Sequence, residues 1–188
     1  MAGSADIMWA TTITYSTLDP SNKGGGVTLS NGNLTAVINI STVLGTVALV
    51  GKKYFEVKID FSPYFSCFGV ANNGVTLGNL LGVDLLGWGL YITNFGTPSQ
   101  GSFHNNGGGA INSNGLNVGD VIGIAYDSST GGMDAYQNGK LIGTVFTGIT
   151  GTVYPAISSA VANSTQLTIN LGQNPFFGIP PAGYTGVY

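Results

Sequence analysis

The stretch GDVIGIAYDSSTGGMDAYQNG, residues 119–139, decides the fold class of this sequence. Residues 121–126 are almost continuously apolar, as expected of a central strand covered on both faces. Asn138-Gly139 lies between two further strand-like segments, residues 133–137 and 140–146. Both central residues of a two-residue type I′ turn need positive φ, which Asn and Gly tolerate. The stretch therefore predicts a β-hairpin that follows a buried strand.

Strand patterns continue on either side of this stretch. Residues 65–71 are mostly apolar, which predicts a second central strand. Residues 34–40 alternate, so that their apolar side chains, the last of them Ile40, share one face. Residues 167–171 alternate in the same way, and no segment repeats apolar residues at helical spacing. The pattern is typical of an all-β chain.

The segment 55–60 predicts a strand with one buried and one wet face. Its inward residues are Phe55, Val57 and Ile59, and its outward residues are Glu56, Lys58 and Asp60.

Composition favours one folded unit. Hydrophobic residues make up 43% of the 188 residues and charged residues 7%, which excludes a disordered chain, and the 31 glycines suit many tight turns. We expect a bent antiparallel β-sandwich of two packed sheets over residues 11–188. Residues 1–10 are predicted to be a tail or an attachment segment. Residues 174–184 hold too many prolines for a central strand and predict an extended cover.

Charge and hydropathy exclude several functions. The net charge is −3, the chain has no arginine, and the cluster Lys52, Lys53 and Lys58 is too small for nucleic acid. The apolar run 43–50 is interrupted by Gly45 and too short to span a bilayer. The start of the sequence lacks the basic and apolar regions of a secretory signal. We expect a soluble protein, either cytoplasmic or located in a virus particle.

Candidate chemical groups are few. Cys67, the single cysteine, is predicted to be a buried apolar thiol, and His104 a structural histidine near a turn. Asp120, Asp127 and Asp134 are equally spaced, but the first two flank a strand that holds them apart, so we expect turn and cap roles. The sequence predicts no catalytic residue, no cofactor and no metal site.

The order of segments resembles the SPRY domain. Gly51-Lys-Lys-Tyr-Phe-Glu-Val57 is similar to the family's Gly-x-x-Tyr-Trp-Glu-Val signature, and residues 119–127 and 133–139 match its Gly-Asp-x-Ile-Gly-x-x-x-Asp motif and the strand that ends in Asn-Gly. Further pieces follow in the same order: residues 28–35, 68–71, 88–90, 103–105, 153–157 and 170–176. This agreement over residues 28–184 implies a concanavalin-like jelly roll and a non-enzymatic recognition role.

The resemblance also implies a contact surface made of loops at one end of the sandwich. The corresponding residues here are Leu44, Gly45, Thr46, Asn72, Asn73, Leu81, Val161, Ala162 and Asn163. The family often has an arginine in the segment that corresponds to residues 44–46. Here the Val43-Leu44 region replaces it, which makes the expected pocket apolar and lined by amides. Such a pocket suits a sugar or a neutral peptide edge. Turn chemistry alone is the alternative explanation for the Asn72-Asn73-Gly74 segment.

Three functions compete at this point. The first is a binding or adhesion module that recognises a protein or a glycan. In a virus particle, such a module would be a receptor-binding or fibre-tip protein. The second is a structural virion protein, a capsid decoration or fibre component whose partners are virion neighbours or copies of itself, docked through residues 1–23. The third is a glycan-active enzyme, which would need two facing carboxylates, whereas Glu56 and Asp60 share one strand.

Overall fold

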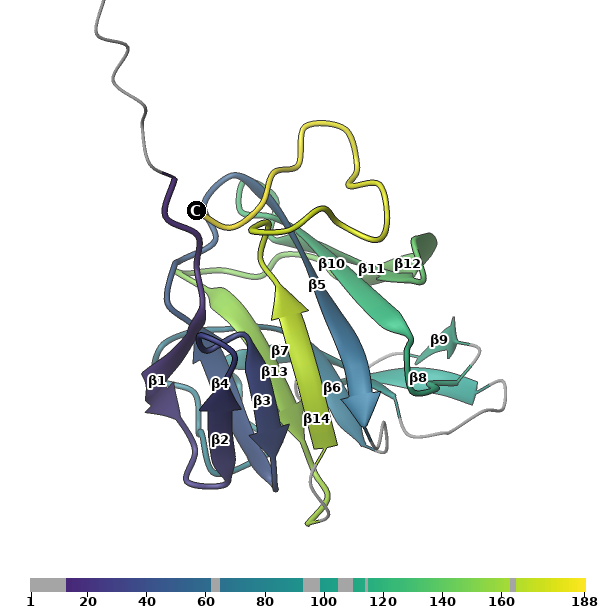
Figure 1. The fold of residues 1–188 in the computed structure, drawn as a ribbon. Helices are drawn as coiled ribbons and strands as arrows, with labels where there is room; N and C mark the ends of the chain where they lie inside the picture. Colours follow the sequence, from purple (N-terminus) through teal and green to yellow (C-terminus); the bar gives the residue numbers. More distant parts are fainter. Residues whose placement is uncertain (1–12, 62–64, 93–98, 105–109, 114, 163–164) are drawn as a thin grey trace, which may run out of the picture.

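Two seven-stranded antiparallel sheets lie face to face (Figure 1). The computed structural model describes residues 13–61, 65–92, 99–104, 110–113, 115–162 and 165–188, and these contain strands and turns but no helix. The all-β sandwich predicted from the sequence is confirmed. In the described residues there is therefore no helix long and apolar enough to cross a membrane.

Sheet A holds, in spatial order, β1 (Leu18–Lys23), β4 (Ser41–Gly45), β13 (Tyr154–Ser159), β6 (Ser66–Ala71), β7 (Gly87–Ile92), β8 (Ser99–His104) and β9 (Ala110–Ser113). Sheet B holds β12 (Lys140–Phe146), β11 (Gly132–Gln137), β10 (Val121–Asp127), β5 (Lys52–Phe61), β14 (Thr165–Asn170), β3 (Thr35–Ile38) and β2 (Val27–Ser30).

The main core fills the space between the two sheets. Phe55, Val57 and Ile59 of β5 are fully buried there, opposite Phe68 and Val70 of β6. Burying one such side chain stabilises the fold by roughly 1.5 to 3 kcal/mol. The alternation of apolar residues therefore determines which face of each strand points inward.

The hairpin between β11 and β12 is confirmed. Asn138 and Gly139 have φ angles of 51° and 77°, as a type I′ turn requires. The Asn138 side chain also accepts a hydrogen bond of 2.9 Å from the backbone N–H of Val121, so the turn is fixed to β10.

The predicted inward position of Ile40 is wrong. Strand β3 ends at Ile38, because the pairs that Ile38 forms with Val27 of β2 and Thr165 of β14 end both ladders there. Ile40 follows with a φ of 37° and a 48% exposed side chain. Its N–H donates to the carbonyl of Val161. Two residues beyond the strand end, the alternation no longer applies.

The C-terminal segment, residues 171–188, crosses the outer face of sheet B (the yellow end of the chain in Figure 1). It returns to the sheet where the N–H of Thr185 donates to Lys52 and the N–H of Tyr54 donates to Thr185. The N–H of Val187 then donates to Leu171. The segment forms no strand, which confirms the prediction of an extended cover.

Candidate functional site

The loop between β6 and β7, loop 72–86, lies across the outer face of sheet A. The backbone N–H of Thr42 donates to the carbonyl of Leu77 at 2.8 Å, and its hydroxyl donates to the carbonyl of Asn79 at 2.7 Å. The N–H of Leu81 donates to the hydroxyl of Ser158 at 2.9 Å. Strands β4 and β13 thus hold the middle of the loop against the sheet.

Glycines of β7 make room for this loop. A Cβ atom on Gly89 would lie 2.2 Å from the Cys67 sulfur, and one on Gly87 would lie 2.7 Å from a Leu81 methyl group. Because both positions lack a side chain, Leu81 packs fully buried in a second apolar cluster. That cluster consists of Leu44, Cys67, Ala71, Val75, Leu81 and Ala156.

The outer side of loop 72–86 carries exposed apolar residues. Val83 is 61% exposed, Leu85 62% and Leu86 40%. Exposed apolar side chains that gather into a patch are a common mark of an interaction site. The loop therefore combines a buried, anchored side with an apolar side that faces solvent.

Asp84 stabilises the turn that presents these residues. Its carboxylate accepts hydrogen bonds from the backbone N–H groups of Thr76 (2.7 Å) and Leu86 (3.0 Å). Partial burial alone would raise the pKa of Asp84, but these backbone hydrogen bonds outweigh it and hold the pKa below its ordinary value.

The structure brings Thr46, Asn72 and Asn73 to the same end of sheet A. Leu44 of β4 pairs with Ala156 of β13, and Ala71 of β6 pairs with Tyr154 of β13. The last residues of β4 and of β6 therefore lie at the same end of the sheet. The Asn72 amide donates to the carbonyl of Thr152 at 2.7 Å, and the exposed Asn73 accepts from the Asn22 amide.

The other predicted contact residues do not contribute side chains to this surface. Leu44, Gly45 and Leu81 are buried, so they support the surface from below and present no side chain to a partner. Val161 and Ala162 follow β13 at the opposite end of sheet A, where Ser159 pairs with both Ser41 and Ser66. Asn163 lies outside the described residues. The prediction that these contact residues share one end of the sandwich is therefore wrong, because β13 runs opposite to β4 and β6.

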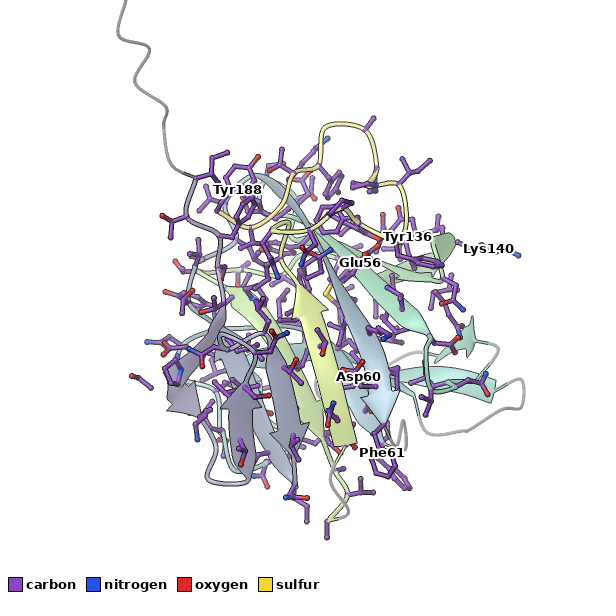
Figure 2. All side chains as sticks on the ribbon, in the orientation of Figure 1. Glu56, Asp60, Phe61, Tyr136, Lys140 and Tyr188 are labelled. Atoms are coloured by element: carbon purple, nitrogen blue, oxygen red, sulfur yellow. The ribbon has the colours of Figure 1, made fainter. Side chains whose placement is uncertain are left out.

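Glu56 corrects another prediction, since its side chain is 3% exposed and does not lie on a wet face. The C-terminal segment covers it, and its carboxylate accepts hydrogen bonds from the N–H groups of Phe177 (2.7 Å) and Gly178 (2.8 Å). The Tyr54 hydroxyl donates to the same carboxylate at 3.0 Å. Figure 2 shows Glu56 below this segment, with Asp60 farther along β5.

Tyr54 lies beside Glu56 on the outer face of sheet B. Its ring meets Phe176 edge to face, with centroids 4.9 Å apart, and its hydroxyl occupies the space above Gly123. Burial, followed by the charge of Glu56, raises the pKa of Tyr54 far above its ordinary value. This tyrosine is a neutral hydrogen-bond donor at any physiological pH.

A pocket of about 330 Å³ opens at the edge of the C-terminal segment. Its lining comes from three strands of sheet B and from that segment: Glu56, Lys58, Val121, Thr168, Asn170, Pro175 and Phe177. The sequence pattern did not predict this pocket, because nothing local to the strands indicates which distant segment covers them.

The remaining predicted groups have structural roles. Cys67 is buried, and burial raises the pKa of its thiol. Asp120 accepts from the Asn117 N–H and the Asn138 amide, Asp127 from Ser129, and Asp134 from Thr144. Within the described part of the chain, no group of three His, Cys, Asp or Glu residues is placed to hold a metal ion. The His104 side chain lies outside the described part.

Comparison with known proteins gives one family. A model of the SPRY domain matches residues 52–174. SPRY domain-containing protein 7 of Homo sapiens is 35% identical over 136 residues, which cover 71% of this chain and 63% of that protein, and the protein of the same name from Mus musculus gives the same figures. The chain thus spans less than two thirds of the length of these relatives.

Solved structures share the fold. The SPRY domain of human HERC1 has a TM-score of 0.67 at 17% identity and covers 84% of this chain and 99% of that chain. Stonustoxin has a TM-score of 0.63 at 21% identity, and the match covers 84% of this chain and 27% of the stonustoxin chain. The PSpry domain of TRIM65 has a TM-score of 0.63 at 16% identity, and the match covers 84% of this chain and 90% of that domain.

Proposed function

Because this chain belongs to the SPRY domain family, we propose that it is a protein-binding module whose contact surface is the outer side of loop 72–86. SPRY domains bind proteins in general and are typically not enzymes. The observation that carries the proposal is the exposure of Val83, Leu85 and Leu86 on a loop that is anchored to sheet A.

The loop has the properties of a preformed interface. An apolar centre loses water when a partner covers it, and polar side chains at its rim provide direction. The rim is formed here by Asn72 and Asn73, since the N–H of Asn72 donates to the carbonyl of Leu86. Because the loop is already held in place by Leu81 and Asp84, binding costs little conformational entropy.

The test uses a double variant, Val83→Ser with Leu85→Ser, and a matched control, Phe61→Ser. Phe61 is 61% exposed like Val83 but lies at the end of β5 in sheet B. A partner captured with the wild-type protein is purified and titrated by calorimetry against all three proteins. We expect the double variant to lose at least about tenfold in affinity and the control to bind as the wild type does.

Equal affinity of the double variant, with circular dichroism and thermal midpoint unchanged, would reject this surface. A loss of the same size in the Phe61→Ser control would also reject it, because the effect would then not be specific to the loop.

A role in a virus particle remains a prediction from composition, whether as a receptor-binding, fibre-tip or decoration protein. The same holds for location in a virion, for self-association and for recognition of a glycan through the loops. Strand β1 occupies residues 18–23, so docking through the N-terminal region would rest on the residues before it. A deletion of residues 1–12 tests this role: loss of particle attachment with partner binding intact would support it, and unchanged attachment would reject it.

A further inference from the structure

The pocket on sheet B has the size and construction of a small-ligand site. Its volume of about 330 Å³ falls in the range of ligand pockets in proteins. Its floor belongs to β5, β10 and β14, which are central strands of sheet B. The pocket lies on the opposite sheet from loop 72–86, so it is separate from the proposed protein contact.

The walls of the pocket are apolar and partly exposed. Phe177 is 67% exposed, and Pro175 stands beside it in the C-terminal segment. The backbone N–H of Phe177 donates to Glu56, which fixes the residue while leaving its ring accessible. An accessible ring face attracts the weakly positive C–H groups of a ligand.

One charged group of the pocket is held by the protein, and another is accessible to a ligand. Glu56 is 3% exposed and its carboxylate already accepts from the N–H groups of Phe177 and Gly178 and from the Tyr54 hydroxyl, so it anchors the wall of the pocket. The Lys58 ammonium lies 3.3 Å from Asp60, and an ammonium has three donors, so two stay available. Both charged residues that line the pocket already have partners, Lys58 in Asp60 and Glu56 in three hydrogen-bond donors, which favours an uncharged ligand with hydroxyl groups.

An extended peptide fits this site less well. Peptides that add to a sheet need a free strand edge. Strand β5 is paired on one side with β10 and on the other with β14 along the pocket. The pocket therefore offers side chains and no backbone groups of β5.

We infer that this pocket binds a pyranose ring of a neutral glycan. One face of the ring stacks on Phe177, and its hydroxyl groups accept hydrogen bonds from the Lys58 ammonium. Thr168 and Asn170 of β14 also line the site, and the Asn170 amide donates to the carbonyls of Asn174 and Pro175 in the C-terminal segment.

The experiment is a nuclear magnetic resonance titration of the full, isotopically labelled chain with a panel of methyl glycosides of neutral hexoses and N-acetylhexosamines. We expect at least one glycoside to shift the amide signals of Lys58, Thr168 and Phe177. Phe177→Ala keeps the backbone N–H that donates to Glu56, and it should weaken that binding at least about tenfold. Lys58→Met should weaken it as well.

Phe61→Ala is the matched control, because Phe61 is exposed to a similar degree as Phe177, lies on β5 with Lys58 and does not line the pocket. It should bind the glycoside as the wild type does. The inference is overturned if no glycoside shifts these signals. It is also overturned if Phe177→Ala binds unchanged, or if a proline-rich peptide shifts the same signals while no glycoside does. A failure here leaves the proposed protein contact standing, since loop 72–86 is tested on the other sheet.

Discussion

At the scale of single residues, Glu56 shows how one side chain joins distant parts of the chain. It is the only glutamate, and its carboxylate receives two consecutive backbone N–H groups from Phe177 and Gly178. Hydrogen bonds to a charged acceptor are stronger than those between neutral groups. The side chain thus fixes the C-terminal segment to the middle of sheet B.

Replacing this carboxylate should destabilise the protein. We expect Glu56→Ala to lower the free energy of unfolding by roughly 2 to 4 kcal/mol, because it removes charged hydrogen bonds and leaves two backbone donors without their acceptor. Urea denaturation measures the change. Asp134→Asn is the control, since that carboxylate lies half-buried at the surface and accepts from the Thr144 hydroxyl. Equal stability of Glu56→Ala and wild type would contradict the role of Glu56.

Asp84 predicts a pH dependence. Its pKa is lowered in the folded protein, so the carboxylate stabilises the fold above the ordinary aspartate pKa of about 3.9. That stabilisation is lost as the pH falls through the lowered pKa. The thermal midpoint of Asp84→Asn should therefore lie below that of the wild type at neutral pH, and the gap should close in acid. A gap that is constant with pH would contradict this assignment.

At the scale of elements, strand β7 is a surface that must stay free of side chains. A methyl group on Gly89 would meet the Cys67 sulfur at 2.2 Å, and Leu81 packs over the same spot. The two faces of β7 pack against different parts of the protein. Trp88 and Leu90 pack against the main core, and the glycines on the other face leave space for loop 72–86.

Gly89→Ala should therefore displace the loop and destabilise the fold by about 1 to 3 kcal/mol, the usual cost of overpacking. Thermal denaturation, with amide exchange of the loop, measures both effects. Gly25→Ala is the matched control, because a Cβ there meets no heavy atom within 4 Å. If both variants had the same stability, close packing at β7 would not be what holds the loop.

At the scale of the whole molecule, the C-terminal segment acts as part of sheet B. Phe176 covers Tyr54, Thr185 pairs with Lys53 in a parallel bridge, and Val187 accepts from the N–H of Ser16. The end of the chain thereby contacts the start of the described residues and the centre of a sheet.

Deleting residues 174–188 should expose Tyr54 and the outer face of sheet B. We expect a clear drop in the urea midpoint and increased binding of an apolar dye. Ile179→Ser is the control, since Ile179 is almost fully exposed and should change neither. An unchanged urea midpoint after the deletion would show that the segment contributes nothing to stability.

The sequence was informative wherever one short segment carries the whole signal. The Asn138-Gly139 turn and the inward faces of β5 and β14 follow from local backbone preference and alternation, and the structure agrees with them. The candidate site was predicted less well. Asn73 is exposed and Asn72 half-buried, whereas Leu44 and Leu81 are buried, because exposure depends on which segment covers a residue.

The sequence by itself determined the fold class, several central strands and the family, because these depend on the order of short patterns along the chain. The tertiary structure alone decided that Glu56 lies under the C-terminal segment, that loop 72–86 lies on sheet A, and that Val161 lies at the far end from Asn73. These are contacts between residues far apart in sequence, and alternation within a strand indicates which face is outward but not what packs against it.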